Sequence, residues 1–267
     1  MNPIAIVSAL HDELSKVLEL MPDEHKQSRA GREFWLGHLH GQAVVVVLSG
    51  IGKVAAATTA TLLIEHFGVS HIVFTGVAGA LNHAVKVGDI VVASSFVQHD
   101  MDASPIFPRY EIPGYGMAAF KADDTLSQEL AAACKEVLYQ LNGVVEADVI
   151  HAFDLHAPQL HQGLIVSGDR FVSTALESRQ LQQDLPDALA VEMEGAAFAQ
   201  VCHDYGVPFA AVRTISDRAD DDATVDFTRF LAEVASHYSA HIVDKWLQAM
   251  SATRRPSIAH LETHQYR

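Results

Sequence analysis

The chain has 267 residues, of which 49% are hydrophobic and 19% charged, so it can bury a substantial core and wholesale disorder is not expected. With 18 basic and 33 acidic residues, the net charge is −15, which argues against a nucleic-acid partner or an anionic membrane surface. The N-terminus has no basic segment typical of a secretory signal, and the apolar runs are too short to span a bilayer. A cytoplasmic protein is therefore expected.

Short segments that are β-branched and almost continuously hydrophobic predict buried strands at residues 4–8, 43–48, 72–75, 90–93, 164–167, 189–191 and 209–214. Helical patterns lie between them at residues 53–67, 125–140, 195–205 and 226–250. This alternation predicts an α/β fold with a mostly parallel central sheet flanked by helices. Residues 32–49 predict a hairpin with a tight turn at His40-Gly41, which makes the sheet mixed.

No linker interrupts the chain, so we expect one domain over residues 1–250 and a polar tail over residues 251–267. The segment 100–116 contains three prolines and three aromatic residues and predicts an irregular functional or interface loop. Cys134 and Cys202 cannot form a disulfide framework or a metal cluster and are expected to be core residues.

Polar residues follow several predicted strands at the point where each strand ends. In open α/β sheets, ligands bind beyond the carboxyl ends of the strands. All but one of these ends carry a carboxylate, and the exception is a loop of small residues that lets a ligand approach the backbone. The segments are ALHDE (9–13), GVAGA (76–80), GDRFV (168–172), EME (192–194) and ISD (215–217).

Glu192 and Glu194 are the strongest signal among these residues. Alternation along a strand would place both side chains on one face. A buried carboxylate costs several kcal/mol unless it is compensated, so these two charges predict either a buried partner or a ligand. Taken alone, Glu13 could be a first-turn residue stabilised by a helix dipole, and Asp217 could be a cap.

Other chemistry has little support in the sequence. The 16 histidines form no metal-ligand pattern, and there is no Walker lysine loop and no nucleophile elbow. The GIGK turn at residues 50–53 is only a weak match to a phosphate loop. No metal and no organic cofactor is expected.

Seven stretches in chain order resemble the 5'-methylthioadenosine/S-adenosylhomocysteine nucleosidases of the purine nucleoside phosphorylase superfamily. They are SGIGKVAAA (49–57), FTGVAGAL (74–81), KVGDIVVAS (86–94), FKADD (120–124), GLIVSGDRFV (163–172), VEMEGAAFAQVCH (191–203) and VPFAAVRTISDRAD (207–220). The resemblance implies the three-layer fold of that superfamily, a homodimer and a small-molecule nucleoside substrate. It also implies hydrolysis that releases adenine and a 5-thio-substituted ribose, as in methionine salvage.

The resemblance also assigns roles to individual positions. Glu13 matches the glutamate that activates water, and Asp217 matches the aspartate that protonates purine N7. Glu194 matches the carboxylate that holds the ribose hydroxyls. The remaining matches line the pocket or support these groups: Ala78, Gly79, Phe171 under the base, Val172 at its Watson–Crick edge, Met193 against the sugar, Ser216 beside Asp217, Arg213 and Glu192.

These roles agree with what cleavage of an N-glycosidic bond requires. The reaction builds positive charge on the sugar and leaves a poor purine anion, so it needs a protonated acid at the base and an ionised base near the water. A third carboxylate on the diol would orient the sugar and favour its cationic character.

Two departures from the family pattern affect the expected substrate. Val77 and Ala80 replace polar or smaller residues of the motif T-G-S-A-G-G. The loop 100–116, from which Phe107 and Pro113 are candidate contributors to the pocket for the 5'-substituent, differs from the better-known forms, and residues 144–161 resemble an insertion. Three alternative functions stay open. The protein could be a hydrolase of another adenosine derivative such as 5'-deoxyadenosine or aminofutalosine, a purine nucleoside phosphorylase, or a non-catalytic nucleoside-binding protein. A carboxylate in ALHDEL, where a phosphate would be repelled, favours hydrolysis over phosphorolysis.

Overall fold

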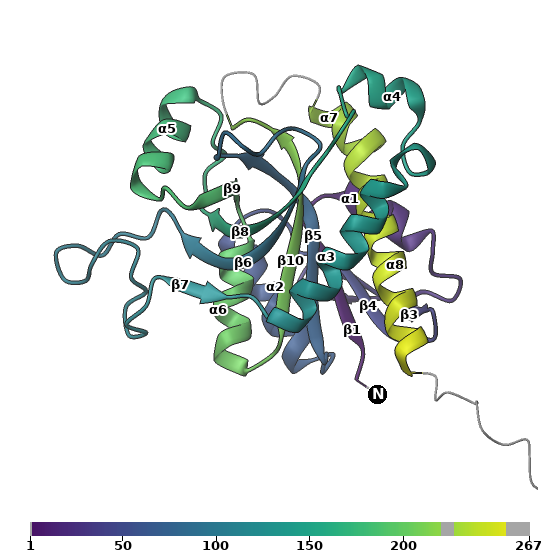
Figure 1. Cartoon of the computed structure of the whole chain (residues 1–267). Helices are drawn as coiled ribbons and strands as arrows, with labels where there is room; N and C mark the ends of the chain where they lie inside the picture. The colour runs from purple at the N-terminus through teal and green to yellow at the C-terminus, as the bar shows by residue number, and fades with distance from the viewer. Residues whose placement is uncertain (1, 220–226, 255–267) are drawn as a thin grey trace, which may run out of the picture.

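The computed structural model describes residues 2–219 and 227–254 as a curved sheet with helices on both sides (Figure 1). The strands are β1 Ile4–Ser8, β2 His25–Arg29, β3 Arg32–Leu39, β4 Gln42–Leu48, β5 His71–Ala80, β6 Ile90–Gln98, β7 Ala119–Lys121, β8 Leu160–Ser167, β9 Ala188–Glu192 and β10 Phe209–Asp217. The helices are α1 His11–Leu18, α2 Lys53–Glu65, α3 Asp124–Tyr139, α4 Ala147–Ala152, α5 Ala175–Asp184, α6 Gly195–Tyr205, α7 Phe227–Phe230 and α8 Ser236–Arg254. A 3-10 turn lies at Leu141–Gly143, and a π-helical turn at Leu231–Ala235 joins α7 to α8.

The strand order is β10-β6-β8-β9-β5-β1-β4-β3-β2, and β10 also pairs with β5. The pairings of β1 with β4 and β5, of β10 with β5, and of β8 with β6 and β9 are parallel. The hairpin β3–β4 and the pairings β2–β3, β6–β7, β6–β10 and β5–β9 are antiparallel. The mixed α/β fold expected from the sequence is confirmed.

Both faces of the sheet are buried, which explains the continuous hydrophobicity of its strands. In β1, Ile4 and Ile6 pack into a core shared with α1, α3 and α8, whereas Ala5 and Val7 pack into a core shared with α2 and α6. This alternation follows the two-residue repeat of a strand. The sheet is therefore a middle layer between two helical layers.

Several strands are longer than the sequence indicated, and the prediction of a loop at residues 76–80 is wrong. β5 continues to Ala80 because β10 pairs with it as far as Gly79, and β9 pairs with Gly79 and Ala80 on the other side. These neighbours satisfy backbone groups that a glycine-containing segment would otherwise expose. β10 similarly continues to Asp217, with a register shift between Ile215 and Asp217.

Several further elements were not predicted, among them β2, β7, α4 and α5. β2 is an exposed edge strand of polar residues (HKQSR) and has no hydrophobic pattern. α5 begins after Thr174, whose hydroxyl caps the helix by accepting from the Glu177 backbone N–H and donates to the Glu177 carboxylate. α4 lies within the segment 144–161.

The predicted helix 226–250 is divided at the π-helical turn and extends to Arg254, so residues 251–254 are helical rather than part of a tail. Residue 226 and the rest of the predicted tail lie outside the described residues. Among the helices in the described part of the chain, none combines the length and the apolar character needed to cross a bilayer.

Candidate active site

A small pocket of about 90 Å³ lies where β5, β9 and β10 end. Most of the residues singled out in the sequence line it: Ala78, Gly79, Phe171, Val172, Glu192, Met193, Glu194, Ser216 and Asp217. The remaining lining residues are Ala9, Leu10, Ile51, Val77, Arg170, Val191 and Phe227. The fold therefore brings together segments that lie more than two hundred residues apart in the chain.

Glu13 lies behind the wall of this pocket, only 1% exposed, in the first turn of α1. One carboxylate oxygen accepts from the backbone N–H groups of Ala9 and Leu10 at 3.2 and 3.0 Å, and the other accepts from Val77 at 2.9 Å. All three donors belong to pocket-lining residues. Burial raises the pKa of Glu13 to about 7, against the effect of these hydrogen bonds and of the Arg213 charge. Glu13 can therefore gain or lose a proton near neutral pH.

Two glycines of β5 let the carboxylates of Glu13 and Asp217 approach the strand. A Cβ atom on Gly76 would lie 2.9 Å from an oxygen of Glu13. A Cβ atom on Gly79 would lie 2.9 Å from an oxygen of Asp217. Side chains at either position would push these carboxylates away. The glycines of TGVAGA therefore leave room for the two carboxylates, in addition to any ligand.

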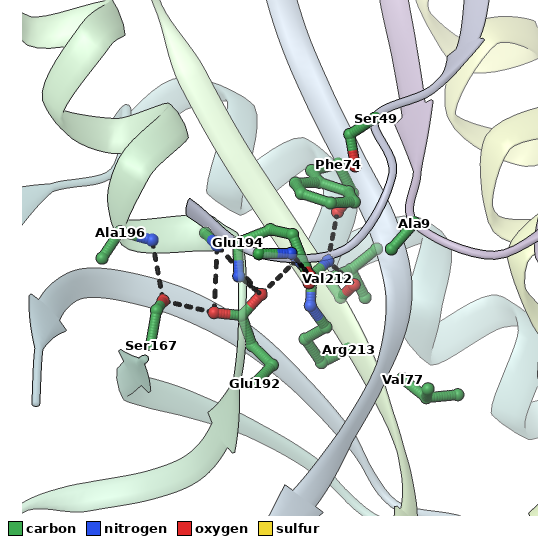
Figure 2. A network of polar contacts seen from close by, with 12 residues as sticks. Ala9, Ser49, Phe74, Val77, Ser167, Glu192, Glu194, Ala196, Val212 and Arg213 are labelled. Atoms are coloured by element: carbon green, nitrogen blue, oxygen red, sulfur yellow. Dashed lines mark hydrogen bonds and ion pairs between the residues drawn. The ribbon is translucent and has the colours of Figure 1, made fainter. Parts of the chain in front are cut away.

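Arg213 compensates the charge of Glu192 in a buried ion pair with an N–O distance of 2.8 Å (Figure 2). Glu192 also accepts from Ser167 and from the backbone N–H groups of Glu194 and Gly195. Arg213 donates to the carbonyls of Phe74 and Val212 as well and lies 4.1 Å from the centre of the Phe74 ring. Both charges of this pair are thus satisfied inside the protein, so Glu192 is held rather than free to bind ligand.

Glu194 is the buried carboxylate of the VEME motif that is less fully compensated. Its side chain accepts from the backbone N–H of Gly52 at 2.8 Å and is 6% exposed as a residue. Burial, and then the neighbouring charge of Glu192, raise the pKa of Glu194 to about 8. The Gly52 hydrogen bond and the Arg213 charge oppose this shift.

The prediction that Glu192 and Glu194 share one face of a strand is wrong, because Glu194 does not belong to the strand. β9 ends at Glu192, and Glu194 is the residue that precedes the first turn of α6. Both side chains are nevertheless buried and line the same pocket, because the chain bends between the strand and the helix.

We expect the free energy of unfolding to fall between about pH 5 and pH 8. In this range the folded chain keeps protons on Glu13 and Glu194 that the unfolded chain has released, so the folded state is favoured at the lower pH and the advantage disappears as pH rises through the raised pKa values. The substitution Glu194→Gln keeps an acceptor for Gly52 and should reduce this fall by a few kcal/mol, on the order of 2–4.

Denaturant unfolding at several pH values measures this effect. Glu19→Gln is the matched control, because Glu19 is exposed and forms a surface ion pair with Lys16. If the free energy of unfolding depended on pH equally in wild type and in Glu194→Gln, the raised pKa of Glu194 would be contradicted.

Asp217 ends β10 and is 8% exposed. The hydroxyl of Ser216 donates to one of its oxygens and the backbone N–H of Ala219 to the other, both at 2.8 Å. These two contacts fix the orientation of the carboxyl group at the edge of the pocket. Ser216 therefore lies where it can steady Asp217, as the family resemblance implied.

The opposite side of the pocket is largely apolar. The rings of Phe171 and Phe227 meet edge to face at 6.3 Å, and Phe171 remains 45% exposed. Val172 and Met193 complete this side. An exposed aromatic face beside a carboxyl group can stack on a flat heterocycle while the acid contacts its edge. Phe227 and Ile51 were missed in the sequence, because only the fold places them at this pocket.

Phe107 and Pro113 do not reach the pocket within one chain. The segment between β6 and β7 projects away from the sheet (Figure 1). Arg109 pairs with Asp184 at 3.0 Å, and the Tyr115 hydroxyl donates to Asp204 at 2.8 Å, which holds this loop against α5 and α6. A contribution of Phe107 and Pro113 to a pocket stays a prediction that requires a second subunit.

The N-terminus of α2, where the GIGK turn lies, is already occupied by carboxylates of the protein. Gly52 donates to Glu194, and the Lys53 backbone donates to Asp169 at 2.7 Å. The Lys53 ammonium pairs with Asp100 at 2.5 Å. The protein's own carboxylates thus occupy the N–H donors that an external anion could bind at this helix end. Within residues 2–219 and 227–254, no group of three or more histidine, cysteine or acidic side chains is placed to hold a metal.

A family model described as the phosphorylase superfamily matches residues 3–248, so the chain belongs to this superfamily. Among solved structures, the 5'-methylthioadenosine/S-adenosylhomocysteine nucleosidase of Neisseria meningitidis, in complex with methylthio-immucillin-A, is 32% identical. The match covers 93% of this chain and 100% of that one, with a TM-score of 0.80.

Two structures from Helicobacter pylori are similarly close. A variant nucleosidase with 5'-methylthioadenosine in its active site is 33% identical, covers 93% of this chain and 99% of that one, and has a TM-score of 0.79. A futalosine hydrolase is 34% identical, covers 93% and 98%, and has a TM-score of 0.78. Within the superfamily, the chain is therefore an enzyme of the nucleosidase type, an N-glycosyl hydrolase.

Proposed function

We propose that this enzyme hydrolyses the N-glycosidic bond of 5'-methylthioadenosine and S-adenosylhomocysteine, releasing adenine and a 5-thio-substituted ribose. The observation that carries the proposal is that Glu194 and Asp217 line one pocket, while Glu13 lies directly behind its wall and accepts from Ala9, Leu10 and Val77 of its lining. The names of the similar nucleosidases support the choice of substrate.

In this mechanism the three carboxyl groups divide the work. Asp217, oriented by Ser216 and Ala219, donates a proton to purine N7 and neutralises the leaving group. Glu13 takes a proton from the attacking water, for which a pKa of about 7 is well matched to neutral pH. Glu194 holds the ribose hydroxyls and stabilises positive charge on the sugar. Phe171 stacks on the adenine.

Water is favoured over phosphate as the second substrate because of the charges at the pocket. Arg170, which lines the pocket, is paired with Glu177, and Arg213 is paired with the pocket-lining Glu192. The amide donors at the start of α2 are occupied by Glu194 and Asp169. A phosphate dianion would face carboxylates instead of free cations.

A second candidate substrate is an aminofutalosine-type nucleoside, because one of the similar enzymes is a futalosine hydrolase. The same three carboxyl groups would serve this reaction, and only the 5'-substituent differs; 5'-deoxyadenosine belongs to the same class. A homodimer in the cytoplasm acting in methionine salvage completes the proposal. Ile51, Val54 and Ile106 are 59%, 79% and 81% exposed, and such apolar side chains suit a subunit interface.

Base release from methylthioadenosine, S-adenosylhomocysteine, 5'-deoxyadenosine, adenosine and aminofutalosine, each with and without phosphate, tests the proposal. We expect phosphate-independent release of adenine and a free sugar, fastest with a 5'-thio substituent. A sugar 1-phosphate as product would identify a phosphorylase. Tight binding of these nucleosides without any release would identify a binding protein.

A further inference from the structure

A second cavity, of about 360 Å³, lies between the end of β5 and α5. It is lined by Ala80, Leu81, Asn82, His83, Val85 and Lys86 after that strand, by Ala175, Ser178, Arg179 and Gln182 of α5, and by Arg218. The two cavities share no lining residue, and one apolar cluster contains Leu81 of this cavity together with Val172 and Val191 of the catalytic pocket. The second cavity is therefore a separate space.

The described side chains that line this cavity are rich in positive charge. Lys86, Arg179 and Arg218 are basic, His83 can become so, and no aspartate or glutamate is among the described lining residues. None of the three permanent cations forms an ion pair with another described residue, although Arg109, Arg170, Arg213 and Arg229 all do. In a chain of net charge −15, such a concentration of cations in a concave site attracts anions specifically.

Polar donors and an apolar wall accompany the cations. α5 presents Ala175, Ser178, Arg179 and Gln182 at a spacing that places them on one face of the helix. Ser178 lines the cavity and is only 5% exposed. Ala80, Leu81 and Val85 supply an apolar side.

From these observations we infer that the cavity binds a small organic phosphate, with the phosphate group on Lys86, Arg179 and Arg218 and the carbon skeleton against Ala80 and Val85. Arginine side chains hold phosphate oxygens through paired N–H donors, and a hydroxyl donor such as Ser178 adds to this set. The volume exceeds what a bare phosphate ion fills and lies within the range of pockets for small organic ligands.

Isothermal titration of the full chain with phenyl phosphate and with inorganic phosphate, at ionic strength held constant with KCl, tests this inference. Wild type should bind phenyl phosphate with a Kd of about 1 mM or lower, and more tightly than inorganic phosphate. The variant Lys86→Gln/Arg179→Gln should bind it at least about tenfold more weakly. The control Lys121→Gln/Lys135→Gln has the same net charge but alters exposed residues of β7 and α3, and should bind as wild type does.

Saturation with adenine separates this cavity from the catalytic pocket. Binding of phenyl phosphate should persist in the presence of adenine. Loss of binding with adenine, equal affinity in the Lys86→Gln/Arg179→Gln variant, or no binding by wild type would each overturn the inference. The proposed hydrolysis is unaffected by these outcomes, since its test is release of a free sugar rather than a sugar 1-phosphate, in the absence as well as in the presence of phosphate.

Discussion

Replacing Glu13 by glutamine should lower kcat/KM for adenine release by at least about 100-fold, because glutamine cannot take a proton from the attacking water. The side chain would also present an amide group to the backbone N–H groups of Ala9, Leu10 or Val77, which now donate to a carboxylate. Steady-state assays of adenine release with methylthioadenosine measure the effect.

The control and the pH dependence make this prediction specific. Glu19→Gln, at the exposed end of α1, should leave kcat/KM unchanged. In wild type, kcat/KM should fall as pH drops below about 8 and more steeply below about 7, since the ionised forms of Glu194 and of Glu13 are both required. Retention of full activity by Glu13→Gln would remove this residue from the mechanism.

Replacing Asp217 by asparagine should lower kcat for adenine release by at least about 100-fold, because the leaving purine would no longer receive a proton. Asparagine keeps one oxygen that can accept from Ser216 or from Ala219, so the fold of this segment should be preserved. Asp187→Asn, which changes an exposed carboxylate between α5 and β9, is the matched control.

The leaving group distinguishes an acid from a merely structural aspartate. A 4-nitrophenyl riboside with the same 5'-substituent releases 4-nitrophenolate, a stable anion that needs no proton to depart. The Asp217→Asn variant should therefore cleave it within about tenfold of the wild-type rate while it fails on adenine nucleosides. An equal loss on both substrates would contradict a role in protonating the base.

The parts of the fold that could be predicted from the sequence are those with local patterns. β1 and α6 were predicted with their observed bounds, since β1 is a continuous apolar run and α6 begins after a charged strand end and ends before Gly206. The hairpin β3–β4 followed from its tight turn. The predicted end of β5 lies too early in the chain, because the glycines that follow are typical of turns. The strands that pair with β5 on both sides explain why glycines are tolerated there.

The candidate site was predictable to the extent that its residues lie at strand ends. The partner of Glu192 was not, because Arg213 is 21 positions away and the two meet only when β9 and β10 lie around the same pocket. Ile51 and Phe227 have no local signal that links them to a ligand. α5, by contrast, could have been found from the spacing of Thr174 and Glu177.

The raised pKa values of Glu13 and Glu194 have a consequence for ligands that carry no charge. Near neutral pH an empty pocket stores protons on these two buried carboxyls. A nucleoside whose two hydroxyls both donate to Glu194 requires the ionised form, so its arrival should expel a proton into the buffer. Affinity for a neutral nucleoside should thus increase with pH, and the heat of binding should change with the ionisation enthalpy of the buffer. The enzyme would exchange protons with its surroundings before any bond is broken.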